Sequence, residues 1–302
     1  MKTPPFLKPG DTIGIICPAG FMPKEKILNC VSMLKKWGYK VQIGSTVGGK
    51  SKNYFSGTDA ERLMDLQNML DDKRINAIIF GRGGYGTTRI LDEINFDKFA
   101  KNPKWIVGFS DITILHSYIQ NNFNISSIHG PMCGAFNQVP KDNPFVFSLK
   151  DTLEGKPTVY ETAYHPLNNT GKVKAPIVGG NLCLLAHGIG TNAEIETKGK
   201  VLFIEDIGEQ LYNIDRMMLQ LKRSGKFAKI KGFIVGGFSD CKDTERGFGK
   251  NAYEIIFDHI KEFDFPTCFG FPISHERENV AIQLGMKYSL EVNEYKTILS
   301  SL

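Results

Sequence analysis

The feature that most constrains the fold is a regular alternation of strand and helix patterns in the first half of the chain. Segments between the strand patterns carry apolar residues at helical spacing, and one of them begins with a capping-box pattern from Thr58 to Glu61. Strands that alternate with helices form a parallel sheet with helices on both faces. We therefore predict a doubly wound α/β domain at residues 1–150. Its predicted strands are 12–17, 41–43, 76–80, 105–107 and 125–128.

The second half of the chain has a looser pattern. Prolines and a polar run at 168–171 interrupt the periodicity, which indicates a linker at residues 151–174. Residues 175–302 then form a smaller C-terminal domain of mixed α/β type with short strands. The strands expected in this domain include 201–204, 232–235, 280–284 and 288–292.

Composition argues against several classes of protein. The formal net charge of +5 is spread along the chain without a basic run, so we expect no nucleic-acid partner. No apolar stretch is long enough to span a bilayer, and the N-terminus lacks the apolar region of a signal peptide. The six cysteines show neither C-x-x-C pairs nor histidines at zinc-ligand spacing. We expect a cytoplasmic protein with reduced cysteines and no membrane contact.

Residues 104–113 place a serine where a strand pattern changes to a helix pattern. The apolar run 105–107 is followed by Gly108, and apolar residues recur at helical spacing from Ile112 onward. Ser110 should therefore project from the carboxyl edge of the sheet, as in a nucleophile elbow. The usual elbow has a second glycine where Ile112 stands, so the match is partial. From these residues alone, Ser110 is either a nucleophile or a serine that caps a helix.

A second motif, at residues 81–86, has glycines at positions 81, 83 and 86. This spacing satisfies the dinucleotide-binding fingerprint, although it follows the third predicted strand rather than the first. Glycines at a strand–helix turn expose backbone N–H groups to an anion, either a phosphate or the oxyanion of a tetrahedral intermediate. A tight turn without a ligand is the remaining interpretation.

A carboxylate and a histidine supply the other groups that a serine hydrolase needs. Glu205 ends an apolar strand pattern, where it can orient a histidine, ligate a metal or simply end the strand. His275 lies in a loop with glycine and proline, and such loops often carry catalytic groups. Ser110, Glu205 and His275 form a hydrolase triad if they meet in space. Their spacing does not show that they meet, so acyl transfer and nucleotide binding both remain open.

Several motifs that occur together resemble those of one family along nearly the whole chain. They lie at 82–86, 108–111, 129–132, 179–182, 203–206, 212–217 and 270–275. With these motifs the chain resembles the LD-carboxypeptidases, serine peptidases that include murein tetrapeptide carboxypeptidases and microcin C immunity proteins. Phe109 stands where the family more often has tyrosine, a change that leaves the serine in place.

The resemblance implies a role for each member of the triad. Ser110 would be the nucleophile, His275 the general base and Glu205 the residue that orients it, with the triad assembled across a cleft between the domains. A serine needs an imidazole to accept its proton, and the imidazole needs a carboxylate on its other nitrogen. The family uses no metal, we expect no cofactor, and the family occurs mostly as homodimers.

Other residues are candidates for binding the substrate. The backbone N–H group of Asp111 and a second one from the loop of Gly83 and Gly84 are expected to form an oxyanion hole, and either glycine can supply the second donor; we name Gly84. A carboxypeptidase also recognises a terminal carboxylate, for which a cation is the natural partner. The candidate substrate-binding residues are Gly83, Tyr85, Arg82 and Arg216.

The expected activity is removal of the terminal D-alanine from a murein tetrapeptide in cell-wall recycling, through an acyl-enzyme. A microcin-immunity enzyme that cleaves a peptidyl-nucleotide amide is the nearest alternative. From other classes, a dinucleotide-dependent oxidoreductase and a muropeptide-binding protein without activity remain open.

Overall fold

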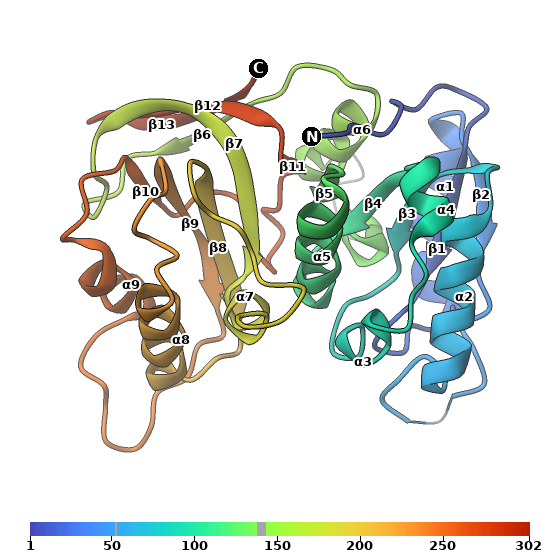
Figure 1. Ribbon diagram of the computed structural model, residues 1–302, viewed down its shortest axis with the longest axis horizontal. Helices are drawn as coiled ribbons and strands as arrows, with labels where there is room; N and C mark the ends of the chain where they lie inside the picture. The colour runs from blue at the N-terminus through green and yellow to red at the C-terminus, as the bar shows by residue number, and fades with distance from the viewer. Residues whose placement is uncertain (52, 138–142) are drawn as a thin grey trace. The chain divides into compact units, whose positions relative to one another are not determined.

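The computed structural model describes residues 1–51, 53–137 and 143–302, and the chain separates into two compact units. Unit 1 consists of Met1–Lys156 with Ala281–Gln283, and unit 2 consists of Pro157–Val280 with Leu284–Leu302. Each unit is built on its own β-sheet (Figure 1). The predicted α/β class is confirmed.

Unit 1 contains a six-stranded sheet with the strand order β11-β5-β4-β3-β1-β2. The pairs β1–β2, β1–β3, β3–β4 and β4–β5 are all parallel, as the alternating pattern predicts. Their carboxyl ends therefore lie along one edge of the sheet. The strands are β1 (Thr12–Ile16), β2 (Lys40–Ile43), β3 (Ile75–Phe80), β4 (Trp105–Gly108), β5 (Ser127–His129) and β11 (Ile282–Leu284).

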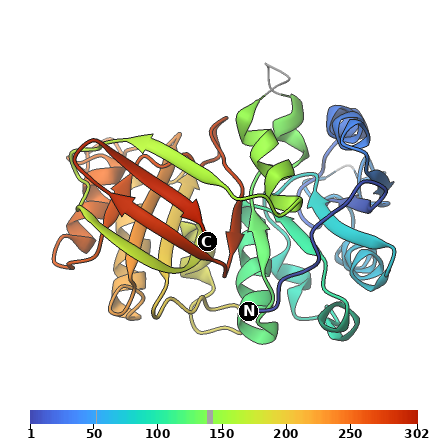
Figure 2. The same ribbon diagram turned by 90° about the horizontal axis from the view of Figure 1, so that it is seen from above.

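Helices cover both faces of this sheet (Figure 2). Side chains of α1 and α6 form one core cluster with alternate residues of β1 and β3, including Ile13 and Ile79. Gly14 faces the other way, where a Cβ atom would lie 2.8 Å from the sulfur of Met69 on α2. The helices of this unit are α1 (Leu28–Lys36), α2 (Asp59–Asp71), α3 (Thr88–Leu91), α4 (Asp97–Lys101), α5 (Thr113–Phe123) and α6 (Pro144–Leu153).

The capping box predicted before α2 is present. The hydroxyl of Thr58 accepts a hydrogen bond from the Glu61 N–H at 3.2 Å, and the Glu61 carboxylate accepts one from the Thr58 N–H at 2.8 Å. The described part of the unit also contains three short 3₁₀ helices: Lys24–Ile27, Ser110–Ile112 and Cys133–Asn137.

Unit 2 contains a seven-stranded sheet with the order β10-β9-β8-β7-β12-β13-β6. The long strand β7 joins two kinds of pairing: its last residues run parallel to β8, whereas its first residues run antiparallel to β12. The strands are β6 (Val159–Ala163), β7 (Gly171–Asn181), β8 (Val201–Ile207), β9 (Gly232–Ser239), β10 (Thr267–Phe269), β12 (Lys287–Val292) and β13 (Lys296–Ser301).

Three helices pack on the parallel part of this second sheet. They are α7 (Leu182–His187), α8 (Leu211–Arg223) and α9 (Ala252–Ile260). Their apolar faces form a core with Leu202 and Ile204 of β8 and with Phe233 and Val235 of β9. Among the residues that the structure describes, none of the helices is long and apolar enough to cross a membrane.

Two segments differ from the order expected along the chain. β11, expected within the second domain, joins the sheet of unit 1 beside β5, because a parallel sheet accepts strands from any part of the sequence. The segment predicted as a linker, 151–174, includes the end of α6, all of β6 and the start of β7.

Candidate active site

Ser110 lies in the sharp turn that the sequence predicts between β4 and α5. It begins the short 3₁₀ helix Ser110–Ile112, and α5 starts directly afterwards at Thr113. The backbone φ of Ser110 is 61°, in the left-handed region that non-glycine residues rarely adopt. Such a conformation persists only where the surrounding structure enforces it, and nucleophile elbows are one such place.

The glycine loop, residues 81–86, lies directly against Ser110. A Cβ atom at position 83 would be 3.0 Å from the Cβ of Ser110, 3.2 Å from its Oγ and 3.4 Å from the backbone nitrogen of Asp111. Gly84 has a φ of 96°, which only glycine adopts without strain. The glycine-loop backbone is therefore next to the Ser110 hydroxyl and the Asp111 N–H, as an oxyanion hole formed by this loop requires.

Two buried polar side chains fix the glycine loop. The carboxylate of Asp111 is 1% exposed and accepts a hydrogen bond from the Thr87 N–H at 2.8 Å, and burial raises the pKa of Asp111. The guanidinium of Arg62 is fully buried and donates to the carbonyl oxygens of Gly86, at 2.8 Å, and of Pro18. Arg62 is not among the site residues predicted from the sequence, because an arginine on a helix normally indicates an exposed face.

His116 supports the turn from the side of α5. Its Nε2 is 2.9 Å from the carbonyl oxygen of Gly108, and the Gly130 N–H donates to the same oxygen at 3.3 Å. Burial lowers the pKa of His116 to about 4, so the ring is neutral at pH 7 and its N–H donates to Gly108. The backbone is thus anchored two residues before Ser110.

Glu205 and His275 are in direct contact in unit 2. The Glu205 carboxylate is fully buried in the second half of β8, and its Oε2 lies 2.6 Å from the Nδ1 of His275. This contact assigns the proton of the neutral imidazole to Nδ1 and leaves Nε2 as the nitrogen that accepts a proton. The pair has the geometry of the histidine and carboxylate of a catalytic triad.

A local irregularity in β9 brings the His275 loop close to Glu205. Ile204 pairs with Val235 and Asp206 pairs with Phe238, so β9 has one residue more than β8 over this interval. A Cβ atom at position 236 would overlap the carbonyl oxygen of Ile273, and the Gly237 N–H donates to that oxygen at 2.9 Å. This pair of glycines is not among the residues predicted from the sequence, although their place just after the predicted strand 232–235 indicates a bulge or a close backbone contact.

Burial and the neighbouring charges shift the pKa of His275 in opposite directions. Burial favours the neutral imidazole, but the charge and hydrogen bond of Glu205, with the charge of Asp206, outweigh burial and raise the pKa of His275. Burial and the charge of Glu205 raise the pKa of Asp206 to about 7. The Asp206 carboxylate accepts hydrogen bonds from the Asn181 amide at 2.7 Å and from the Cys183 N–H at 2.9 Å.

The remaining predicted residues are found on the surface of the two units. Arg82 is exposed on the glycine loop and donates to the carbonyl oxygen of Phe21 at 3.1 Å. Tyr85, on the same loop, is 52% exposed. Arg216 is exposed on α8 in unit 2, with its guanidinium 5.2 Å from the ring centre of Tyr212.

Two family domains match this chain, one in each half of the sequence. The LD-carboxypeptidase N-terminal domain matches residues 13–130, and the LD-carboxypeptidase C-terminal domain matches residues 174–290. The matches define a serine carboxypeptidase, a hydrolase. The chain belongs to the LD-carboxypeptidase family. The glycine motif at 81–86 is thus part of a peptidase domain rather than of an oxidoreductase.

Individual relatives cover almost the whole chain. A probable murein peptide carboxypeptidase of Bacillus subtilis is 35% identical over 301 residues, which are 99% of this chain and 94% of that protein. The microcin C7 self-immunity protein MccF of Escherichia coli is 26% identical over 93% of this chain and 91% of its own length. The crystal structure of muramoyltetrapeptide carboxypeptidase from Oxalobacter formigenes superposes with a TM-score of 0.87, at 29% identity, covering 96% of this chain and 98% of that one.

Proposed function

We propose that this protein removes the C-terminal D-alanine from murein tetrapeptides, with Ser110 as nucleophile, His275 as general base and Glu205 as the residue that orients it. The observation that carries the proposal is the 2.6 Å contact between Glu205 and His275, in a chain whose Ser110 has the backbone of a nucleophile elbow. The names of the murein and muramoyltetrapeptide carboxypeptidases among its relatives support the choice of substrate.

In the proposed reaction, Ser110 Oγ attacks the carbonyl carbon of the residue before D-alanine while His275 Nε2 accepts the hydroxyl proton. The negative charge on the tetrahedral oxygen is stabilised by the N–H groups of Asp111 and Gly84, and each such donor is typically worth about 3 kcal/mol of barrier. The imidazolium then protonates the leaving amine of D-alanine, and an acyl-enzyme on Ser110 remains. Water, deprotonated by His275, hydrolyses this ester and restores the serine. The mechanism requires His275 to come within hydrogen-bond reach of Ser110 in the working enzyme.

We propose that Arg82 or Arg216 pairs with the terminal carboxylate of the substrate, and that Gly83 and Tyr85 contact the peptide. A guanidinium binds a carboxylate through two parallel hydrogen bonds, so it selects a free C-terminus over an internal peptide bond. We further propose that the protein acts in the cytoplasm in cell-wall recycling and that it is a homodimer. Sedimentation velocity, which gives the mass of the particle in solution, tests the homodimer.

Mass spectrometry of a murein tetrapeptide incubated with the protein tests the reaction and the nucleophile together. We expect release of a single D-alanine by the parent protein, none by Ser110→Ala, and unchanged release by Ser32→Ala, a control on the exposed face of α1. Release by Ser110→Ala would show that another group is the nucleophile. If the parent releases none, a peptidyl-nucleotide amide becomes the substrate to test, because MccF is also a relative.

A further inference from the structure

Four polar side chains lie buried between α5 and β5, next to the Ser110 turn (Figure 1). His116 and Gln120 belong to α5, and Ser127 and His129 belong to β5. None of the four is more than 7% exposed. A buried polar group destabilises a fold unless it is hydrogen-bonded, so packing alone does not explain why these residues are here. We call the four residues the polar layer.

The two sides of the polar layer face each other, because α5 covers the side of β5 to which its polar residues point. Ile128 points into the core cluster formed with α1 and α6, so Ser127 and His129 point to the opposite face of the sheet. His129 pairs with Gly108, and a Cβ atom at Gly108 would lie 2.9 Å from Ile112, the residue just before α5. The opposite face is therefore the one that α5 covers.

The polar layer has two levels. His116 Nε2 is 2.9 Å from the carbonyl oxygen of Gly108, which pairs with His129, so both histidines lie at the carboxyl edge of the sheet. Because α5 runs from the end of β4 to the start of β5, Gln120 lies about 6 Å further from this edge than His116. Ser127 precedes His129 by two residues and lies about 7 Å from the edge. Gln120 and Ser127 therefore share the second level.

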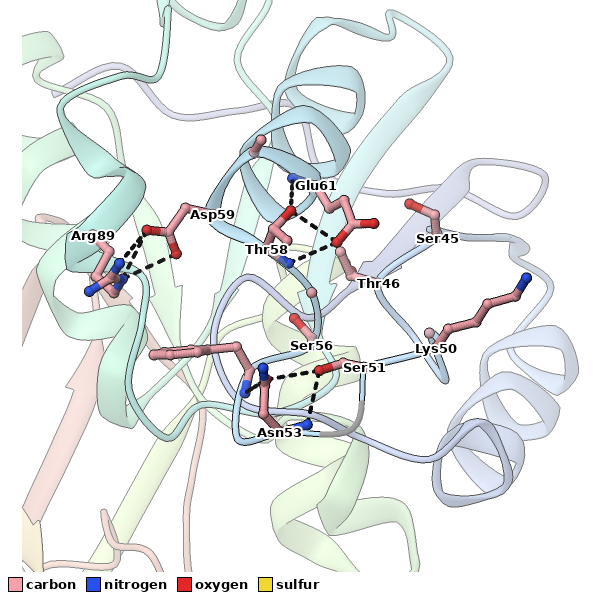
Figure 3. A pocket seen from close by; sticks show the side chains of 14 residues that line it. Ser45, Thr46, Lys50, Ser51, Asn53, Ser56, Thr58, Asp59, Glu61 and Arg89 are labelled. Atoms are coloured by element: carbon pink, nitrogen blue, oxygen red, sulfur yellow. Dashed lines mark hydrogen bonds and ion pairs between the residues drawn. The ribbon is translucent and has the colours of Figure 1, made fainter.

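Three atoms of the polar layer have no hydrogen-bond partner among the residues that the structure describes. They are Nδ1 of His116, the amide nitrogen of Gln120 and the hydroxyl of Ser127. Asp59 and Arg89, in contrast, line the surface pocket before α2 and pair with each other at 2.6 Å, although both are partly exposed (Figure 3). Burial makes an unpaired donor or acceptor far more costly than it is at the surface, so the polar layer requires a partner.

The three atoms are complementary to a single water molecule. The neutral His116 ring donates from Nε2, so its Nδ1 is an acceptor, while the Gln120 amide nitrogen is a donor and the Ser127 hydroxyl is both. Side chains of a helix lean toward its N-terminus, which brings the Gln120 amide toward the His116 ring. A water molecule that accepts from Gln120 and donates to His116 and Ser127 makes three hydrogen bonds, the usual number for buried water.

We propose that one ordered water molecule bridges Nδ1 of His116, the Gln120 amide and the Ser127 hydroxyl, and that this bridge positions the nucleophile. The proposal rests on the function proposed above. A neutral imidazole has one proton for two nitrogens, so a donor at Nδ1 keeps that proton on Nε2, where it bonds the Gly108 carbonyl. Gly108 lies two residues before Ser110, whose φ of 61° persists only where the surroundings enforce it.

A high-resolution crystal structure and histidine ¹⁵N NMR of the parent protein test the bridge itself. We expect electron density for a water molecule within about 2.7–3.2 Å of each of the three atoms. At pH 7 the His116 signals, assigned by their loss in His116→Gln, should show the proton on Nε2 and an accepted hydrogen bond at Nδ1. Absence of this water, direct hydrogen bonds between the side chains, or a proton on Nδ1 would overturn the bridge.

The effect on the nucleophile is tested with Gln120→Leu, which removes the donor and nearly keeps the volume of the side chain. We expect kcat for D-alanine release to fall about tenfold and KM to stay within about twofold, because the nucleophile shifts while no substrate contact is lost. Gln220→Leu, the same change at an exposed position of α8, should leave both values unchanged. A kcat of Gln120→Leu within about twofold of the parent value would overturn the positioning role.

Ser127→Ala provides a second route to the same water, with a smaller change in the core. Its kcat should also fall with KM unchanged, and combining it with Gln120→Leu should cost no more than the worse single change, because both act through one water molecule. Losses that multiply would overturn a shared bridge. The crystal structure and the NMR spectra need no substrate, so a parent protein that releases no D-alanine would refute the proposed function, whereas a missing water would refute the bridge.

Discussion

Replacing Glu205 with glutamine removes the charge that His275 contacts while it keeps the volume of the buried side chain. In the parent protein, Oε2 of Glu205 is 2.6 Å from Nδ1 of His275, and the carboxylate is fully buried. The glutamine amide can still meet Nδ1, but it can do so as a donor, which would favour the wrong tautomer for a general base at Nε2. The variant therefore tests charge and tautomer without creating a cavity.

The expected loss follows from the attraction between the carboxylate and the imidazolium formed during the reaction. Charge centres about 4 Å apart attract by about 4 kcal/mol at an effective dielectric constant near 20. A barrier raised by that amount slows the reaction by about three powers of ten. We therefore expect kcat/KM of Glu205→Gln to fall about 10³-fold at its pH optimum.

The pH profile should also shift, in a direction that the structure determines. The charges of Glu205 and Asp206 raise the pKa of His275 against the effect of burial. The acid limb of kcat/KM reports loss of the unprotonated base, so in the parent protein it lies above the ordinary histidine pKa. Without the Glu205 charge, burial has the larger effect and the limb should move to lower pH.

The assay is D-alanine release from a murein tetrapeptide between pH 5 and pH 9, with Glu276→Gln as the matched control. Glu276 is exposed next to His275, so solvent screens its charge and its replacement should change kcat/KM less than about twofold. If Glu205→Gln retains kcat/KM within about threefold and an unshifted acid limb, the role assigned to Glu205 is refuted.

Three further changes have defined outcomes in urea denaturation. Ser110→Gly should be about 1 kcal/mol more stable than Ser110→Ala, because glycine adopts the observed φ of 61° without strain; equal stabilities would contradict the strained turn. Gly236→Ala should lower the free energy of unfolding by about 1–3 kcal/mol, because its Cβ would clash with Ile273. The control Gly247→Ala should change it little, because its Cβ would meet only an aspartate oxygen at 3.4 Å. Similar losses in the two variants would argue against a close contact between Gly236 and Ile273. Arg62→Lys should cost about 2–3 kcal/mol, because one ammonium group does not reproduce a guanidinium whose Nη1 donates to two backbone carbonyls while its Nη2 binds Asp59; unchanged stability would exclude that support.

The local features of the fold were predictable because they depend on neighbouring residues. The alternation of strand and helix patterns predicts the parallel sheet of unit 1, and the capping box of Thr58 and Glu61 marks the start of α2. The same kind of reasoning predicts the strand–turn–helix around Ser110.

Features that depend on distant residues were not predictable. β11 pairs in the sheet of unit 1 although about 150 residues separate it from β5, and its short apolar pattern gives no information on its partner. The burial of Arg62 depends on carbonyl groups from two loops, and the contact between Glu205 and His275 depends on an extra residue in β9. The residue types of the candidate site were recognisable from the sequence, whereas the side chains that hold them in place were not.

We propose that Ser110 and the Glu205–His275 pair act as one catalytic unit. A double-mutant cycle of D-alanine release tests it most directly, with kcat/KM measured for Ser110→Ala, His275→Ala and the double variant. We expect each single change to lower kcat/KM by about 10³-fold or more and the double variant to lose no more than the worse single variant, because groups that act together are not additive. Losses that multiply in the double variant would show that Ser110 and His275 act independently, and would refute a shared catalytic role.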